Sequence, residues 1–266
     1  MLKRAIASQL VTRPSIWGKV PAHADFVSSR VLKGEREGWE HWLKAQSHIS
    51  PEPAGRPISA ALPVAFVLPP GALQFAPRRF VVGVVARSMD RMGRPHALVV
   101  YQMAHPRWLI QHFEKHVDHP HDWFFWLARA LARHAGLFEA ADIRALERAT
   151  DELWRLHAPN ATYLLPAQWR AAVDPVALVS RSRALLDRLM GATAHDDLAR
   201  RLSGVRFLPW PDWPGCLGGS GSIGGCSDAD PLQNVKSFEG AFWQQDEAGG
   251  FVNASVRLAA LLNGSP

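Results

Sequence analysis

The segment from Ser88 to Arg94 contains the residues best suited to binding an anion or an acidic side chain. Its sequence, Ser-Met-Asp-Arg-Met-Gly-Arg, places Arg91 and Arg94 close to Asp90. An arginine guanidinium can hold a carboxylate or a phosphate through two parallel hydrogen bonds. The two arginines are therefore candidates for binding a partner, and the alternative is an internal ion pair with Asp90. Ser88 and Gly93 are typical of a turn. In an exposed loop, charge reversal of both arginines is expected to leave the fold intact.

A second polar group lies in the segment from Trp17 to Val27. Its members Lys19 and Asp25, together with His23, form a candidate patch for contact with a partner. Asp25 also has a structural interpretation, because an aspartate at the exit of a strand can accept backbone N–H groups and hold the following turn. On that interpretation, Asp25→Ala is expected to destabilise the fold by about 1–2 kcal/mol. Three other residues of this segment are interpreted as fold determinants: Gly18, Pro21 and Phe26.

Five histidines are the strongest candidates for a metal site: His105, His112, His116, His119 and His121. His112 and His116 are four residues apart, a spacing at which two helical side chains can bind one zinc ion. Glu114 does not have the position that the H-E-x-x-H motif requires, and no cysteine is near. We therefore predict no bound metal and no cofactor. A metal-dependent hydrolase that uses residues 105–121 remains the alternative function.

Two further enzyme patterns fail on their context. Residues 219–224 match G-x-G-x-x-G, but the dinucleotide-binding motif needs a strand before it and a helix after it, and neither is expected here. Ser222 lies near glycines, yet the last histidine is His195, so none follows this serine as the α/β-hydrolase order requires. We predict that the protein is not an enzyme. The role of the glycine-rich segment 218–225 is left open.

Composition indicates a globular chain of one or two domains. The 266 residues are 47% hydrophobic and 20% charged, with a formal net charge of +6. The arginines are spread along the chain without a nucleic-acid-binding motif, which argues against a nucleic-acid partner. Two cysteines make no disulfide framework, and no apolar run is long enough to span a membrane. We expect a cytoplasmic protein without membrane insertion; the oligomeric state is left open.

The order of the expected elements predicts an α+β fold, with a mixed, largely antiparallel sheet flanked by helices and a helical middle segment. Apolar runs predict strands at residues 15–20, 64–68, 80–86, 97–101, 205–208 and 240–244. Helical spacing and caps predict helices at residues 34–46, 108–117, 121–138, 142–157, 174–191 and 255–262. Residues 80–86 and 97–101 are expected to pair antiparallel and to be covered on both faces. Residues 1–140 are interpreted as a core domain, and residues 141–266 as a helical segment and late strands that complete the same globule.

Two charged motifs, Trp17–Val27 and Gly83–Arg94, resemble in this order and spacing the TagF family of type VI secretion accessory proteins. The resemblance covers roughly residues 15–105, and it departs from the family pattern at Ala24, Arg87 and Pro95-His96. It implies a non-enzymatic, post-translational repressor of type VI secretion that binds a forkhead-associated scaffold protein in the cytoplasm. A structural accessory subunit of the secretion apparatus is a further alternative. The residues expected to contact the partner are Lys19, Asp25, Asp90, Arg91 and Arg94.

Overall fold

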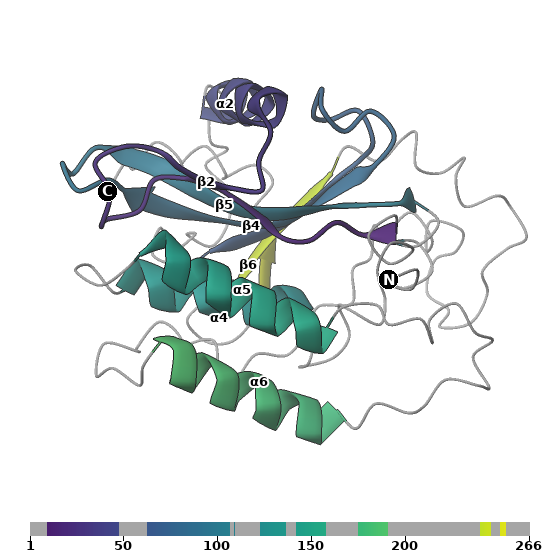
Figure 1. Ribbon diagram of the computed structural model, residues 1–266. Helices are drawn as coiled ribbons and strands as arrows, with labels where there is room; N and C mark the ends of the chain where they lie inside the picture. Colours follow the sequence, from purple (N-terminus) through teal and green to yellow (C-terminus); the bar gives the residue numbers. More distant parts are fainter. Residues whose placement is uncertain are drawn as a thin grey trace, which may run out of the picture.

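The computed structural model describes residues 10–47, 63–106, 109, 123–136, 142–157, 175–190, 240–245 and 251–253. Its centre is a seven-stranded sheet in the order β2-β1-β5-β4-β3-β6-β7, and every described pairing is antiparallel (Figure 1). The strands are β1 (Ser15–Gly18), β2 (Val27–Ser29), β3 (Val64–Leu68), β4 (Phe80–Met89), β5 (Pro95–Ala104), β6 (Ala241–Gln245) and β7 (Phe251–Asn253). The late strand β6 therefore completes the sheet beside β3.

The hairpin of β4 and β5 is the longest pairing in the sheet. It runs in register from Phe80 opposite Ala104 to Met89 opposite Pro95. Consecutive β-branched residues favour an extended backbone and pack well in a sheet that is buried on both faces. The predicted antiparallel pair is confirmed, but the strands continue beyond the predicted ends. Ser88, which we had expected in the loop, is a buried residue of β4.

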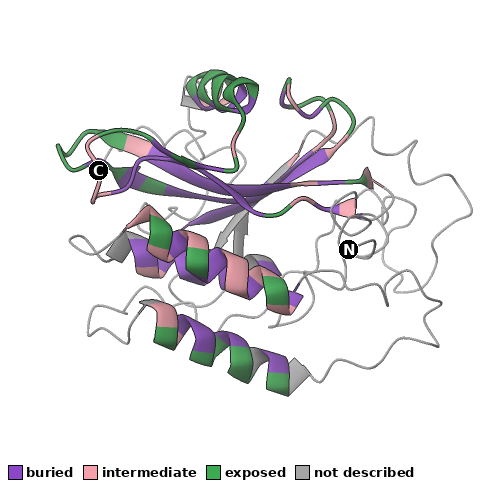
Figure 2. Ribbon diagram, viewed as in Figure 1, coloured by how far each residue is buried: buried purple, intermediate pink, exposed green. Residues whose placement is uncertain are grey.

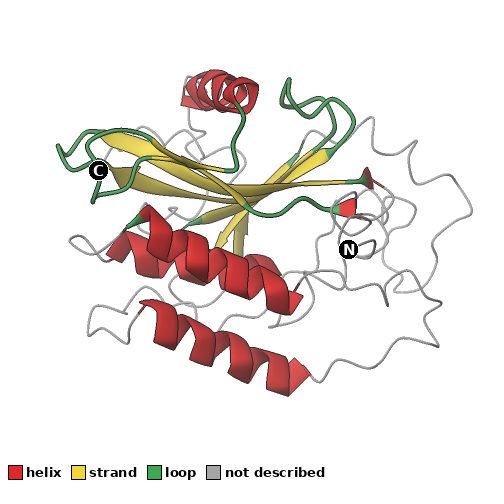
Figure 3. Cartoon of the chain, viewed as in Figure 1, coloured by secondary structure: helices red, strands yellow, loops and turns green. Residues whose placement is uncertain are grey.

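Helices cover the two faces of the sheet unequally. Helix α2 (Lys33–Ser47) lies on one face, and α4 (Trp123–Gly136) and α5 (Ile143–His157) lie on the other (Figure 1). Helix α6 (Pro175–Met190) contacts α4 and α5 and forms a further layer behind them (Figure 3). The α+β class and the predicted sheet flanked by helices are thus confirmed, with the described sheet wholly antiparallel. The boundary near residue 140 stays a prediction.

Each face of the sheet has its own apolar core. On the α2 side, Trp39 and Phe66 are fully buried and their ring centroids lie 5.6 Å apart. On the other side, an apolar stripe of α4 is buried against the sheet and α5; its members are Trp123, Trp126, Leu127, Ala130 and Leu131. Figure 2 shows that burial is continuous through the middle of the sheet and gives way to exposed residues at the end that carries the β4–β5 turn.

Two helix starts are held by carboxylates. The Glu35 carboxylate of α2 accepts hydrogen bonds from the Leu32 N–H at 3.2 Å and the Tyr101 hydroxyl at 2.7 Å, which ties the helix to β5. At the start of α5, the Arg144 backbone N–H donates to the Asp142 side chain, so Asp142 is the N-cap of this helix. Negative charge at these positions also suits the helix dipole.

Some expected elements cannot be compared with the structure. Apart from Leu109, the helix at 108–117 lies outside the described residues, as do the helix at 255–262, the strand at 205–208, both cysteines and the glycine-rich segment. The short strands β2 and β7, of three residues each, were not predicted. In the described part of the chain, no helix is long and apolar enough to cross a membrane.

Candidate functional site

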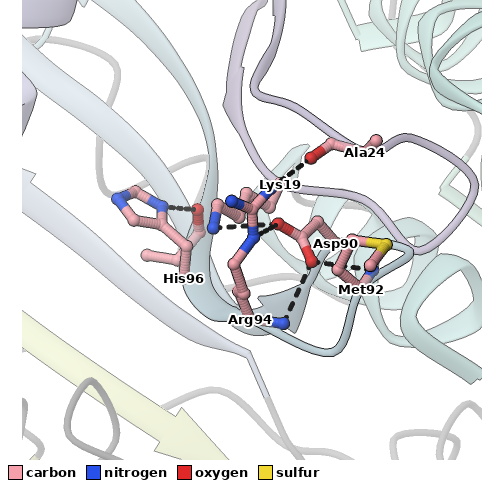
Figure 4. A network of polar contacts seen from close by, with 7 residues as sticks. Lys19, Ala24, Asp90, Met92, Arg94 and His96 are labelled. Carbon is pink, nitrogen blue, oxygen red and sulfur yellow. Dashed lines mark hydrogen bonds and ion pairs between the residues drawn. The ribbon is translucent and has the colours of Figure 1, made fainter.

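Asp90 is the centre of a buried ion-pair network that joins the two charged motifs. It is 1% exposed, at the start of the turn between β4 and β5. Its Oδ2 lies 3.0 Å from Lys19 Nζ and accepts a hydrogen bond of 2.7 Å from Arg94 Nε. Its Oδ1 accepts the backbone N–H groups of Met92 and Arg94 at 2.9 and 3.0 Å (Figure 4). The carboxylate is thus bonded on both oxygens by four donors.

The environment of Asp90 keeps it ionised. Burial alone would raise the pKa of this carboxyl, but hydrogen bonds from the backbone and side chain of Arg94, from Lys19 and from the Met92 backbone outweigh it and hold the pKa well below its ordinary value. A buried, ionised carboxylate has lost its hydration, and it is stable only where hydrogen bonds or ion pairs replace the lost water. Asp90 is therefore part of an internal ion-pair network. This is the alternative to partner binding that the sequence left open for Asp90.

Backbone contacts fasten the turn to the loop between β1 and β2. The Arg91 N–H donates to the His23 carbonyl at 2.8 Å, and Arg94 Nη2 donates to the Ala24 carbonyl at 2.6 Å. The His23 ring in turn contacts Asp142 at the start of α5, with 3.2 Å between Nε2 and Oδ1. This contact lowers the pKa of Asp142. Loop, turn and helix are consequently held as one unit.

An aromatic cluster supports the same loop. The Phe26 ring stacks on Trp17 with centroids 5.5 Å apart, and the edge of His96 meets Phe26 at 4.6 Å. Lys19 Nζ lies 5.3 Å from the centroid of Phe26, within reach of a cation–π interaction. Burial lowers the pKa of His96, so this ring adds no positive charge at neutral pH. Phe26 packs in this cluster, yet the residue is 46% exposed.

Three motif residues shape the backbone around the network. Gly18 has φ of +138°, and a Cβ there would lie 2.1 Å from the Ala97 carbonyl oxygen of β5, so only glycine fits this close approach. Pro21 is in a turn closed by the His23 N–H and the Val20 carbonyl at 3.1 Å. Gly93 has φ of +76°, and its N–H donates to the Asp90 carbonyl at 2.9 Å, which closes the β4–β5 turn.

The predicted contact residues separate into buried and exposed ones. Lys19 and Asp90 are buried and bonded to each other, so they offer a partner almost no surface. Arg94 is 58% exposed at its side chain but is bonded to Asp90. Arg91 and Asp25 are exposed, and neither side chain has a hydrogen bond or ion pair among the described residues. The described part of the chain therefore gives Arg91 no bond to Asp90.

The structure does not give Asp25 the turn-holding role that its sequence position suggested. We had expected it to hold the turn after β1 by accepting backbone N–H groups, but in the described structure no such bond forms and the residue is exposed. The turn is held by the Asp90 network from the neighbouring hairpin instead. The expectation that charge reversal of Arg91 and Arg94 leaves the fold intact also changes, because Arg94 belongs to that network.

The histidine cluster contributes little to the described structure. His112, His116, His119 and His121 lie outside the described residues, and His105 is exposed with its backbone N–H bonded to Leu10. Within the described ranges, no group of three His, Cys, Asp or Glu side chains is placed to hold a metal ion. That the histidines bind no metal therefore stays a prediction.

Sequence reasoning missed the roles of His96 and Ala24. His96 was noted only as a departure from the family pattern, but it packs against two aromatic rings of the first motif. Ala24 receives the Arg94 side chain at its carbonyl, a contact that any residue type could make. No sequence signal reports a backbone acceptor of this kind.

A family model described as the TagF N-terminal domain, type VI secretion system-associated, matches residues 15–153, just over half of the chain. The match includes both charged motifs and every residue of the Asp90 network. The fold and this site are thus those of a type VI secretion-associated protein. The chain belongs to the TagF family, which confirms the resemblance of its two motifs.

Among solved structures, the chain is similar to a crystal structure of PA0076 from Pseudomonas aeruginosa PAO1. The two share 21% sequence identity, with a TM-score of 0.38, over 65% of this chain and 78% of that one. No curated protein matches this chain.

Proposed function

We propose that this protein is a non-enzymatic, post-translational repressor of type VI secretion that binds a forkhead-associated scaffold protein in the cytoplasm. Membership of the TagF family supports the link to secretion. The resemblance of the two motifs to that family supplies the direction of the effect and the identity of the partner.

The interlocked motifs are the observation that carries the proposal. Lys19 and Arg94 are both paired with the buried Asp90, so the charges of these three residues serve to hold a loop and a turn in place. What these two segments direct outward is a set of exposed apolar and cationic side chains. Methionine, aromatic and arginine side chains are enriched where proteins contact each other. The arrangement is suited to binding a protein surface.

Repression follows from binding by mass action. A repressor that occupies the scaffold protein lowers the concentration of free scaffold, and assembly of the apparatus falls with it. The effect requires no change in the amounts of the secretion components. The formal charge of +6 favours an acidic face on the scaffold and a complex that weakens as salt rises.

Overproduction in the native cell tests this function. Secreted type VI substrates should decrease in the culture supernatant, while immunoblots show unchanged cellular levels of the secretion components. Purified scaffold protein should be retained by the immobilised repressor. Undiminished secretion together with no retention would reject the proposal. Stoichiometric recovery of the protein in purified secretion assemblies would favour a structural subunit instead.

A further inference from the structure

Exposed apolar side chains gather at the end of the sheet that carries the β4–β5 turn. The described residues expose four large apolar side chains, and three of them are here: Phe26 at 46%, Met89 at 38% and Met92 at 69%. Met89 belongs to the α2 face, because it continues the alternation of Val81 and Val85, which are in the core beneath α2. Phe26 stacks on Trp17, a residue of the same core.

Two free arginines accompany these side chains. Arg87 is on the same face of β4 as Met89, two residues before it, and Arg91 is in the turn. Both are exposed, and neither side chain has a hydrogen bond or ion pair within the described structure. Asp25, exposed on the adjacent loop, offsets part of this charge. We define the hairpin-end surface as Phe26, Arg87, Met89, Arg91 and Met92.

The hairpin-end surface is built on a rigid support. The Asp90 network holds the turn, and Arg94 fastens the turn to the loop that carries Phe26. Aromatic stacking and the Lys19 contact fix the Phe26 ring itself. A surface that is already ordered loses little conformational entropy on binding, which favours affinity.

From these observations, and resting on the proposed function, we infer that the hairpin-end surface is where the scaffold protein binds, through an acidic segment that also carries large apolar side chains. The carboxylates of such a segment match Arg87 and Arg91, with which they form charge-assisted bonds. Its apolar side chains match Phe26, Met89 and Met92. A purely anionic ligand would use the two arginines and leave the three apolar side chains without a role.

Charge reversal tests the arginine half of the surface. The probe is the purified forkhead-associated scaffold protein of the same secretion system, with affinity measured by biolayer interferometry. Arg87→Glu combined with Arg91→Glu should raise the Kd at least tenfold. The matched control is Arg181→Glu with Arg183→Glu, because both arginines are exposed on α6, on the far side of the molecule. The control makes the same change in net charge and should keep the Kd within twofold.

Met92→Ser tests the apolar half. It should raise the Kd about fivefold, whereas Leu32→Ser, at a side chain that is 71% exposed after β2, should leave it unchanged. Circular dichroism and thermal melting should show all variants folded, since none of these side chains has a bond in the described structure.

Three results would overturn the inference, and they are distinguishable. If the wild type binds the scaffold and the hairpin-end variants bind as well as their controls, the surface is wrong and the proposed function stands. If the wild type does not bind the scaffold at all, both fall. If the Arg87→Glu, Arg91→Glu variant loses co-sedimentation with phosphatidylglycerol vesicles while scaffold binding is unchanged, the surface is a lipid contact instead.

Discussion

Arg94→Ala should destabilise the fold measurably, and Arg91→Ala should not. The two arginines are three residues apart in one turn, and both follow Asp90 closely. Of the two arginine side chains, only that of Arg94 donates to the carboxylate, and the Arg91 side chain is exposed without a bond among the described residues. Arg94→Ala therefore tests the network, and Arg91→Ala is its matched control.

The magnitude follows from two hydrogen bonds. Arg94 Nε donates to Asp90 at 2.7 Å and Nη2 donates to the Ala24 carbonyl at 2.6 Å. A hydrogen bond to a charged group contributes about 1.5–3 kcal/mol when it is buried, and a neutral one about 1 kcal/mol. The Arg94 side chain is 58% exposed, so screening by solvent reduces both. Asp90 also keeps Lys19 as a partner. We expect a loss of about 1–2 kcal/mol for Arg94→Ala, and less than about 0.5 kcal/mol for Arg91→Ala.

Urea denaturation followed by tryptophan fluorescence would measure the difference, with equal m-values required for a valid comparison. Arg94→Lys should lose part of the stability, because an ammonium cannot reproduce the two directed bonds of the guanidinium. High salt should narrow the gap between the two alanine variants. Equal unfolding free energies for Arg91→Ala and Arg94→Ala would refute the assignment of Arg94 to the network.

Three further substitutions, the first with a matched control, test other parts of the structure. Gly18→Ala should prevent stable folding, because its Cβ would lie 2.1 Å from a carbonyl oxygen of β5. Gly34→Ala, with open space around it, should keep or raise the melting temperature. Equal melting temperatures for these two variants would contradict the reasoning. Tyr101→Phe should cost about 1.5–3 kcal/mol by removing the hydroxyl that donates to Glu35. Burial raises the pKa of Tyr101 above its ordinary value of about 10, so the wild type should also lose stability above pH 10 to an extent that the variant does not; parallel alkaline denaturation curves would count against it. Burial lowers the pKa of His134 to about 4, so the unfolded chain takes up the proton first and stability should fall by roughly 3 kcal/mol between pH 6.5 and 4. His134→Leu should remove that loss, and an unchanged acid denaturation curve would disprove the reasoning.

The distribution of charge explains why the two motifs occur together. Lys19 and Asp90 are 71 positions apart; Lys19 would lack a counter-charge among the described residues without Asp90, and Asp90 would lose one of its two ion pairs without Lys19. The first motif supplies the cation and the close approach at Gly18, and the second supplies the carboxylate and the turn. Each motif therefore requires the other in the fold, and what they expose jointly is the hairpin-end surface.

The sequence by itself determined the elements whose signals are local. Short apolar runs predicted β3, β4, β5 and β6, and the near-continuous apolar character of residues 80–86 and 97–101 predicted cover on both faces of that pair. Apolar spacing predicted α2 and α4, and capping residues predicted α5, which begins after Asp142, and α6. These features depend on neighbours within a few residues, so a window of sequence contains the information. The strands β2 and β7 were missed because three residues are too short for a periodic pattern.

Only the tertiary structure decided which charged residues are internal and which are free. Arg91 and Arg94 look equivalent in the sequence, and the path of the turn directs one to Asp90 and the other outward. Asp25 and Asp90 look equally suited to hold a turn, yet only Asp90 lies where four donors converge. Ion pairs form between groups that the fold brings within about 4 Å, and burial then sets their strength. The distance between two charged groups and their burial both depend on segments far apart in the chain, so no local sequence pattern reveals either of them.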